Sequence, residues 1–249
     1  MAIHFLRRLS GMQRTEKSNE HLGFALAFVA GAANAGGFLA VAQYTSHMTG
    51  IVSSMADNLV LGYVGVSAAG LGALLSFLLG AACSAILINW ARRQRLQSVY
   101  ALSLLLEAFL LLCFGLVGAN LTHHMGFYVS LTVMLLCFIM GLQNAIMTKI
   151  SHSVIRTTHV TGVVTDLGIE LGKLIYWNRM TSLPEENRVL GNRTKLRLLA
   201  TLLLVFFVGA LTGAYGFKHV GFISTVPLAA ILLVLAIVPV VDDVVERFK

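Results

Sequence analysis

Two polar stretches decide how this chain is organised: Gly31-Ala-Ala-Asn-Ala35 and, after a short gap, His47-Met-Thr-Gly-Ile-Val52. Both recur in the same order as Gly141-Leu-Gln-Asn-Ala145 and His159-Val-Thr-Gly-Val-Val164, with two more residues in the second gap than in the first. Polar groups are costly inside a membrane, so their repetition in an apolar chain requires a reason. The pattern predicts an internal duplication with a functional centre in each copy.

The composition is that of an integral membrane protein. Of the 249 residues, 57% are hydrophobic and 12% are charged, whereas soluble proteins carry roughly 25% charged residues. The net charge of +7 comes from basic residues in short segments between apolar runs. There they indicate membrane orientation and contact with anionic lipid heads. The sequence therefore predicts membrane lipids as partners and excludes nucleic acid.

Six apolar runs are long enough to cross a bilayer, which takes about 20 residues. They are Leu22–Tyr44, Val64–Trp90, Ser98–Ala119, Gly126–Met147, Leu198–Phe217 and Val220–Val241. Two shorter and more polar segments, 48–63 and 159–177, are ambiguous. The first contains Asp57 and Asn58, and the second contains Asp166, Glu170 and Lys173.

The positive-inside rule decides whether the short segments cross, because it places basic short loops in the cytoplasm. If neither crosses, the basic segments 1–20, 92–95, 178–197 and 242–249 all lie inside, and the Lys-free and Arg-free loop 120–125 lies outside. If one crosses alone, a basic loop is forced outside. If both cross, 92–95 is misplaced. Both segments are therefore predicted to be re-entrant or broken half-helices.

Three spans per half is an odd number, so the second half starts on the opposite side of the membrane. A third match, Phe77–Ala85 against Phe206–Ala214, supports the duplication. The predicted fold class is an all-α polytopic membrane protein with six transmembrane helices as two inverted three-helix repeats, each with a short half-helix after its first span. The predicted parts are a basic cytoplasmic arm (1–20), repeat 1 (21–119, re-entrant segment 48–63), repeat 2 (120–241, re-entrant segment 159–177, cytoplasmic loop 178–197) and a cytoplasmic tail (242–249).

The two motifs also resemble a known family. Gly31–Phe38 with His47–Gly50, and Met140–Ala145 with Thr158–Gly162, are similar to the YoaK-type family of bacterial integral membrane proteins of uncharacterised function. The resemblance covers nearly the whole chain. It implies a six-span protein of the bacterial inner membrane and implies no activity. This chain departs from the family pattern at Asn34, where Asp is usual, and at Ile51, where Asn is usual.

Each motif combines an amide near the end of a span with a His-x-Thr-Gly that opens a short helix. Thr49 and Thr161 are predicted N-caps, and the free N–H groups of two converging half-helices favour an anionic or zwitterionic solute. His47 and His159 add donors that titrate near physiological pH. A packing role alone is the alternative, with the amides hydrogen-bonded to the opposite repeat. The candidate substrate-binding residues are Asn34, His47, Thr49, Gly50, Asn144, His159, Thr161 and Gly162.

Two acidic residues are candidates for a proton or charge relay. Glu107 lies in the middle of the third span, so it is expected to face the interior and to be either protonated or paired with Lys173, Arg156 or a motif histidine. Asp166 follows Gly162 by one helical turn, where it can face a cavity. Glu170 and Lys173 have the i,i+3 spacing of a local ion pair.

The sequence offers no cofactor and no metal site. Cys83, Cys113 and Cys137 fall inside apolar runs without pairable spacing, and His123-His124 has no neighbouring ligand at metal-binding spacing. Phosphate-loop, Gly-x-Ser-x-Gly and His-Glu-x-x-His motifs are absent from the sequence. No catalytic residue is therefore assigned.

The leading interpretation is a small-solute transporter or channel-like protein of the bacterial inner membrane, with both termini cytoplasmic. One alternative is an intramembrane enzyme acting on a lipid or amphiphile, but the sequence lacks a nucleophile with a nearby base, which favours a non-enzyme. The other alternative is a non-transporting scaffold. A homo-oligomer is left open.

Overall fold

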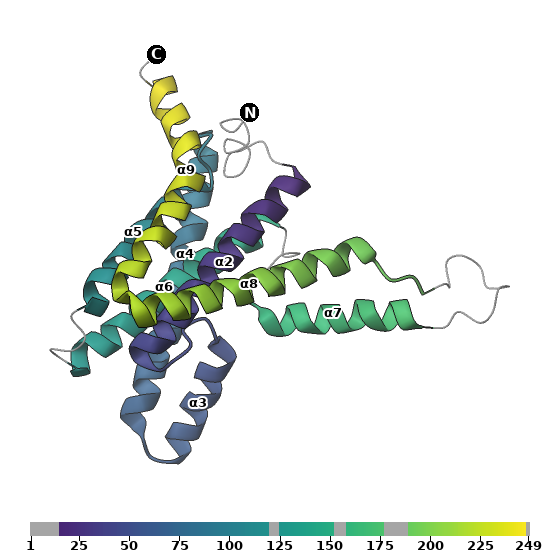
Figure 1. The fold of residues 1–249 in the computed structure, drawn as a ribbon. Coiled ribbons are helices and arrows are strands. Elements are labelled where there is room, and N and C mark those ends of the chain that lie inside the picture. The colour runs from purple at the N-terminus through teal and green to yellow at the C-terminus, as the bar shows by residue number, and fades with distance from the viewer. Residues whose placement is uncertain (1–14, 120–124, 152–157, 177–188, 248–249) are drawn as a thin grey trace.

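The computed structural model describes residues 15–119, 125–151, 158–176 and 189–247. Every regular element within these residues is a helix. Six of the helices are long and apolar enough to cross a membrane, which confirms the prediction of six apolar spans. The helices are α2 (Glu16–Val41), α3 (Met48–Val60), α4 (Val64–Arg93), α5 (Ala101–Ala119), α6 (Met125–Ile150), α7 (Val160–Ile175), α8 (Arg193–His219), the short 3-10 helix η2 (Gly221–Ser224) and α9 (Thr225–Arg247) (Figure 1).

Capping groups extend two of the helices beyond their apolar runs. The Thr15 hydroxyl accepts the Ser18 N–H at 3.2 Å, so α2 begins at Glu16 rather than at Leu22. The Asn192 side chain accepts the Lys195 N–H at 3.0 Å in the same way. The basic residues at the end of the predicted loop 178–197 therefore lie in the first turns of α8.

Helix α2 packs most extensively against α8, a helix from the other half of the chain. A Cβ atom on Gly31 would overlap the Phe206 carbonyl oxygen of α8, and one on Gly209 would overlap the Phe28 carbonyl oxygen of α2. Each helix thus presents a glycine to the backbone of the other. Backbones come this close only where no side chain intervenes.

The α4–α6 crossing has the same construction. A Cβ atom on Gly80 would overlap the Phe138 carbonyl oxygen of α6, and one on Gly141 would overlap the Phe77 carbonyl oxygen of α4. All four helices therefore use a Phe-x-x-Gly sequence, and the first span of each half crosses the second span of the other half.

The remaining spans, α5 and α9, pack against each other, and α5 also packs against α6. The main core lies between α2, α5, α6 and α9. Its fully buried side chains include Leu22, Leu26, Leu104, Leu111, Phe114, Leu136, Ile146 and Leu232. A smaller cluster of Ile51, Ala73 and Cys137 joins α3, α4 and α6.

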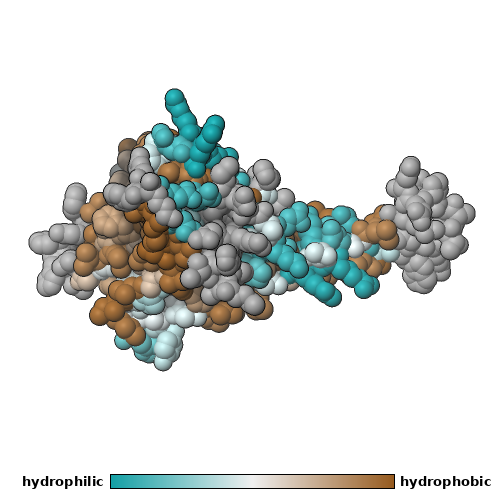
Figure 2. All heavy atoms as spheres, turned by 90° about the horizontal axis from the view of Figure 1, so that it is seen from above, coloured by the Kyte–Doolittle hydropathy of each residue, from teal (hydrophilic) through white to brown (hydrophobic). Residues whose placement is uncertain are grey.

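The two short helices lie on separate arms of the molecule (Figure 1). The first arm consists of α3 and residues 64–72 of α4, and the second arm consists of α7 and residues 193–201 of α8. Figure 2 shows hydrophilic residues gathered on the second arm, whereas hydrophobic residues cover much of the adjoining bundle.

Several helix ends meet on one side of the bundle. The Asn19 amide donates to the Ile150 carbonyl oxygen at 3.4 Å, which joins the start of α2 to the end of α6. Asp243 near the end of α9 accepts the N–H groups of Gln97 and Ser98 at 2.7 and 2.9 Å. The start of α2, the α4–α5 connection and the ends of α6 and α9 therefore share one side.

Candidate functional site

The first motif is centred on the loop between α2 and α3. Helix α2 ends at Val41 because Ala42 adopts a left-handed conformation with φ of 53°. The Asn34 side-chain oxygen then accepts the Ser46 N–H at 3.4 Å and the Ser46 hydroxyl at 3.0 Å. The Tyr44 ring stacks on Phe38 with the centroids 4.6 Å apart. These contacts hold the loop against the end of α2.

The two short helices begin directly after the motif histidines. His47 (φ −95°, ψ 71°) and His159 (φ −86°, ψ 59°) have non-helical backbones and occupy the N-cap positions. The prediction that Thr49 and Thr161 cap these helices is wrong, because both threonines already lie in the first helical turn. Neither histidine caps its helix through its side chain.

The glycine of His-x-Thr-Gly accommodates the histidine ring. A Cβ atom on Gly50 would overlap the His47 ring, and one on Gly162 would overlap the His159 ring. The ring folds over the first turn of its own helix in both copies. Both motifs therefore share a local structure that a larger residue at the glycine position would displace.

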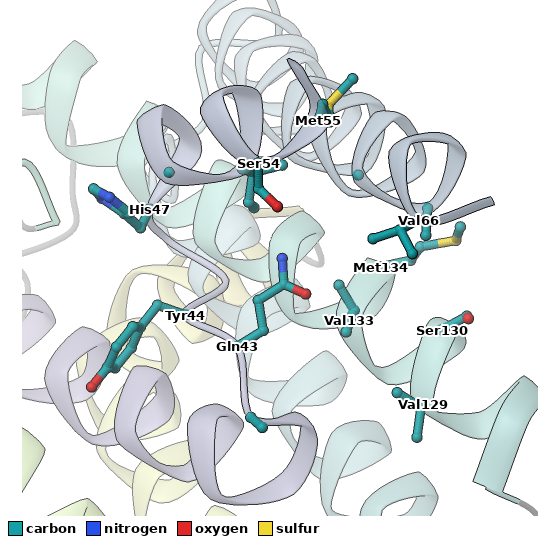
Figure 3. Close-up of a pocket in the computed structure, with 15 residues that line it drawn as sticks. Gln43, Tyr44, His47, Ser54, Met55, Val66, Val129, Ser130, Val133 and Met134 are labelled. Carbon is teal, nitrogen blue, oxygen red and sulfur yellow. The ribbon is translucent and has the colours of Figure 1, made fainter. Parts of the chain in front are cut away.

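A pocket of about 400 Å³ opens beside the first motif (Figure 3). It lies between the α2–α3 loop and the helices α3, α4 and α6. The described residues of its wall include no Asp, Glu, Lys or Arg. The lining residues are Ala42, Gln43, Tyr44, His47, Gly50, Ile51, Ser54, Met55, Val66, Ala69, Gly70, Val129, Ser130, Val133 and Met134.

Two polar side chains extend into this pocket. In Figure 3 the Gln43 amide and the Ser54 hydroxyl point toward one another, and Val133 and Val66 lie to one side of them. The His47 ring turns away from the centre in this view. Ser54 Oγ accepts a hydrogen bond from the Asn58 amide at 3.1 Å, which leaves its own O–H available to donate.

The predicted substrate-binding residues divide between two places. His47 and Gly50 line the pocket, Asn34 positions its loop, and Thr49 is exposed at the start of α3. None of the lining residues that the structure describes comes from the second motif.

The second motif lies at the end of α6 and the start of α7. Asn144 is half-buried on α6, His159 and Thr161 are exposed, and Gly162 lies under the His159 ring. The Thr161 carbonyl oxygen accepts the Thr165 hydroxyl at 2.9 Å. Residues 152–157, in the connection before this motif, lie outside the described part of the chain.

Glu107 lies inside the bundle on α5 with no exposed surface. Among the described residues, neither of its carboxyl oxygens has a hydrogen-bond partner. One turn earlier, Ser103 is within 3.4 Å of the Ser84 hydroxyl of α4. Of the suggested partners, Lys173 pairs with another residue, and Arg156 lies outside the described residues.

The acidic residues of α7 belong to an ion-pair cluster. Glu170 contacts Lys173 at 3.0 Å, as the i,i+3 spacing predicts, and accepts the Asn192 N–H at 2.8 Å. Asp166 lies 3.5 Å from Lys195, which also approaches Glu170 at 3.9 Å. The Asn192 backbone N–H, the Lys173 hydrogen bond and the charges of both lysines lower the pKa of Glu170. This cluster joins α7 to the start of α8.

The sequence interpretation missed Gln43 and Ser54. Neither belongs to a repeated motif, and the counterpart of Ser54, seven residues after the motif histidine, is Asp166. Ser54 is one of several polar residues in α3, so the sequence offered no specific signal for it. Within the described residues, no group of three His, Cys, Asp or Glu side chains is arranged to hold a metal ion.

A family model described as a protein of unknown function, DUF1275, matches residues 22–238. The chain belongs to this DUF1275 family. The match supports the expectation of an uncharacterised family, while the narrower YoaK-type assignment and the bacterial origin stay predictions from the motifs. No curated protein and no solved structure matches the chain. Membership in DUF1275 therefore indicates no substrate and no reaction.

Proposed function

We propose that this DUF1275 protein is a small-solute transporter or channel-like protein. The observation that carries the proposal is the pocket of about 400 Å³ beside the first His-x-Thr-Gly motif, between helices of both halves. Pockets of this size accommodate small molecules. Polar groups that line a cavity in a membrane bundle are characteristic of substrate and ion pathways.

An inverted repeat is part of the proposal. The paired crossings support it, since α2 meets α8 through the same Phe-x-x-Gly contacts by which α4 meets α6. The two short helices support it as well, because each follows the first span of its half and packs on the second. Halves related in this way can rock against each other and expose a site alternately to the two sides.

The orientation completes the proposal: an inner-membrane protein with the side that carries Arg92, Arg93 and Arg95 in the cytoplasm. Gln94→Cys and Lys218→Cys test it, since Gln94 follows α4 and Lys218 lies near the end of α8. A membrane-impermeant thiol reagent added outside intact cells should label position 218 and leave position 94 unlabelled. The reverse pattern would invert the assignment. Cys83, Cys113 and Cys137 are replaced by Ala in both variants.

Flux through proteoliposomes tests transport itself. Entry of glycerol and urea into the proteoliposomes is followed by stopped-flow light scattering. Uptake of labelled acetate and glycine tests an anion and a zwitterion. At least one solute should move faster than in protein-free liposomes, and His47→Ala should change that rate severalfold because His47 lines the pocket. His21→Ala, at an exposed position in the first turns of α2, is the matched control. Protein-free rates for all four solutes would favour the scaffold alternative.

A further inference from the structure

The pocket beside the first motif, called the first-arm pocket below, has no Asp, Glu, Lys or Arg among its described lining residues. Among its described lining residues, the titratable ones are Tyr44 and His47, and the His47 ring turns away from the centre in Figure 3. An ion entering such a site would lose its hydration without gaining a counter-charge, which costs several kcal/mol. The pocket therefore disfavours both anions and cations.

The pocket nevertheless offers directed hydrogen bonds. The Gln43 amide is half-buried and has no hydrogen-bond partner among the described residues, so both its N–H and its C=O are available. The Ser54 hydroxyl faces it in Figure 3. Apolar atoms of Ile51, Met55 and Val133 complete the wall. A ligand with one carbonyl or hydroxyl group and an apolar body matches these surroundings.

The second arm has charges at the corresponding positions. Ser54 and Asp166 both lie seven residues after the motif histidine, and Val66 and Lys195 both lie fourteen residues before the crossing glycine of α4 or α8. Asp166 and Lys195 contact each other at 3.5 Å. A serine and a valine thus stand in the first arm where an ion pair joins α7 to α8.

We infer that the first-arm pocket binds an uncharged, partly apolar small molecule with a single amide-type or alcohol-type group, held between Gln43 and Ser54. The inference specifies the solute class and rests on the proposed function in treating this pocket as the solute site. It replaces the anionic solute suggested by the helix ends with a neutral one, because the described residues of the pocket wall supply no positive charge.

Three probes of nearly equal size and different charge test the inference: benzamide (neutral), benzoate (anionic) and benzamidinium (cationic). Each is titrated at pH 7 onto the full-length protein in lipid nanodiscs by isothermal calorimetry, with empty nanodiscs correcting for partition into lipid. Benzamide should bind saturably and at least about tenfold more tightly than either ion, a difference of about 1.4 kcal/mol.

Variants connect the binding to the pocket. Gln43→Leu and Ser54→Ala should each weaken benzamide binding about 3- to 10-fold, the effect of one lost hydrogen bond. Ser53→Ala, on an exposed neighbour outside the pocket wall, should bind as the wild type does. Val66→Lys, which introduces the residue type of the second arm, should weaken benzamide binding and favour benzoate. The melting temperature of each variant establishes that it is folded.

Three results would overturn the inference: benzoate binding as tightly as benzamide, no saturable binding beyond empty nanodiscs, or wild-type affinity in both Gln43→Leu and Ser54→Ala. Failure of the transport proposal looks different. In that case benzamide binds with the expected variant pattern while proteoliposome flux stays at the protein-free rate. Flux that persists without benzamide binding instead rejects the neutral solute class.

Discussion

The two arms share a backbone plan and differ in charge. In both, a histidine folds over the glycine three residues later and a short helix packs on the next span. The first arm, 48–72, contains one charged residue, Asp57, whereas 160–175 and 193–201 of the second arm contain six. The comparison indicates that backbone contacts specify the shared shape and that charge distinguishes the arms.

One matched pair of hydrogen bonds shows how the difference arises. In the first arm the Tyr63 N–H donates to the Asn58 backbone carbonyl oxygen at 2.8 Å. Asn192 occupies the same position in the second arm, seventeen residues before the crossing glycine, and its N–H donates to the Glu170 carboxylate at 2.8 Å. Both bonds join the short helix to the start of the next span. In the second arm this link is charge-assisted, and the lysines beside it are held in ion pairs.

The surroundings that suit each arm follow from this difference. The tip of the first arm exposes Val60, Leu61 and Tyr63, with Val60 89% exposed. Such a surface is stable against lipid or protein. The basic residues of the second arm suit the headgroup region of an anionic leaflet. The two surfaces differ in the way that the proposed inverted repeat predicts for arms on opposite sides of the membrane.

Replacing the glycines at the helix crossings should cause the largest loss of stability, and the loss should be similar at the α2–α8 and α4–α6 crossings. Gly80→Ala and Gly209→Ala each place a methyl group against a backbone carbonyl oxygen, so each should destabilise the protein by about 3 kcal/mol or more. Thermal unfolding in detergent micelles measures the loss. Gly65→Ala, with no atom within 4 Å of its added Cβ, is the control. A severe effect at one crossing and none at the other would contradict their equivalence.

Removing the Glu170 charge should loosen the second arm alone. Glu170→Gln weakens the bond from the Asn192 N–H and releases Lys173 and Lys195, so the α7 amides should exchange hydrogen severalfold faster. Hydrogen exchange followed by mass spectrometry measures both arms in one sample. Protection of α3 should stay unchanged, and Glu246→Gln on the exposed end of α9 serves as the control. Equal loosening of α3 would refute the separation of the arms.

Acidification should likewise reduce the hydrogen-exchange protection of the second arm and leave that of the first arm unchanged. The pKa of Glu170 is lowered in the folded protein by the Asn192 N–H and by Lys173. Its contribution is therefore complete above the ordinary carboxyl pKa and is lost as the pH falls through the lower folded-state value. After correction for intrinsic exchange rates, α7 protection should fall relative to α3 only at such acidic pH. A loss between pH 8 and 6 would assign the effect to another group.

The smallest change is expected at Asp166. Its ion pair with Lys195 is partly exposed, with both side chains more than a third accessible, so Asp166→Asn should change the unfolding free energy by less than about 1 kcal/mol. A charge-relay role for Asp166 predicts, in addition, that the variant changes solute flux. If the same variant alters the pH dependence of solute flux in proteoliposomes, Asp166 contributes to the relay, and unchanged flux restricts it to the ion-pair cluster.

Some features of the site could be predicted from the motifs because they depend on residues close together in sequence. The His-x-Thr-Gly motif marked the starts of α3 and α7 to within two residues, and the i,i+3 spacing of Glu170 and Lys173 predicted their ion pair. The threonine caps failed because the last non-helical residue is the histidine, a boundary that depends on backbone angles rather than on residue type.

The sequence by itself determined the membrane class, the six apolar spans and the two copies of the motif, because hydropathy and short motifs are properties of neighbouring residues along the chain. Only the tertiary structure decided that each Phe-x-x-Gly meets its counterpart in the other half, that Gln43 and Ser54 face one pocket, and that Glu107 is buried without a partner among the described residues. The Phe-x-x-Gly contacts join residues far apart in sequence. Close backbone packing between the halves brings them together, and no local pattern encodes which helix will supply the neighbour.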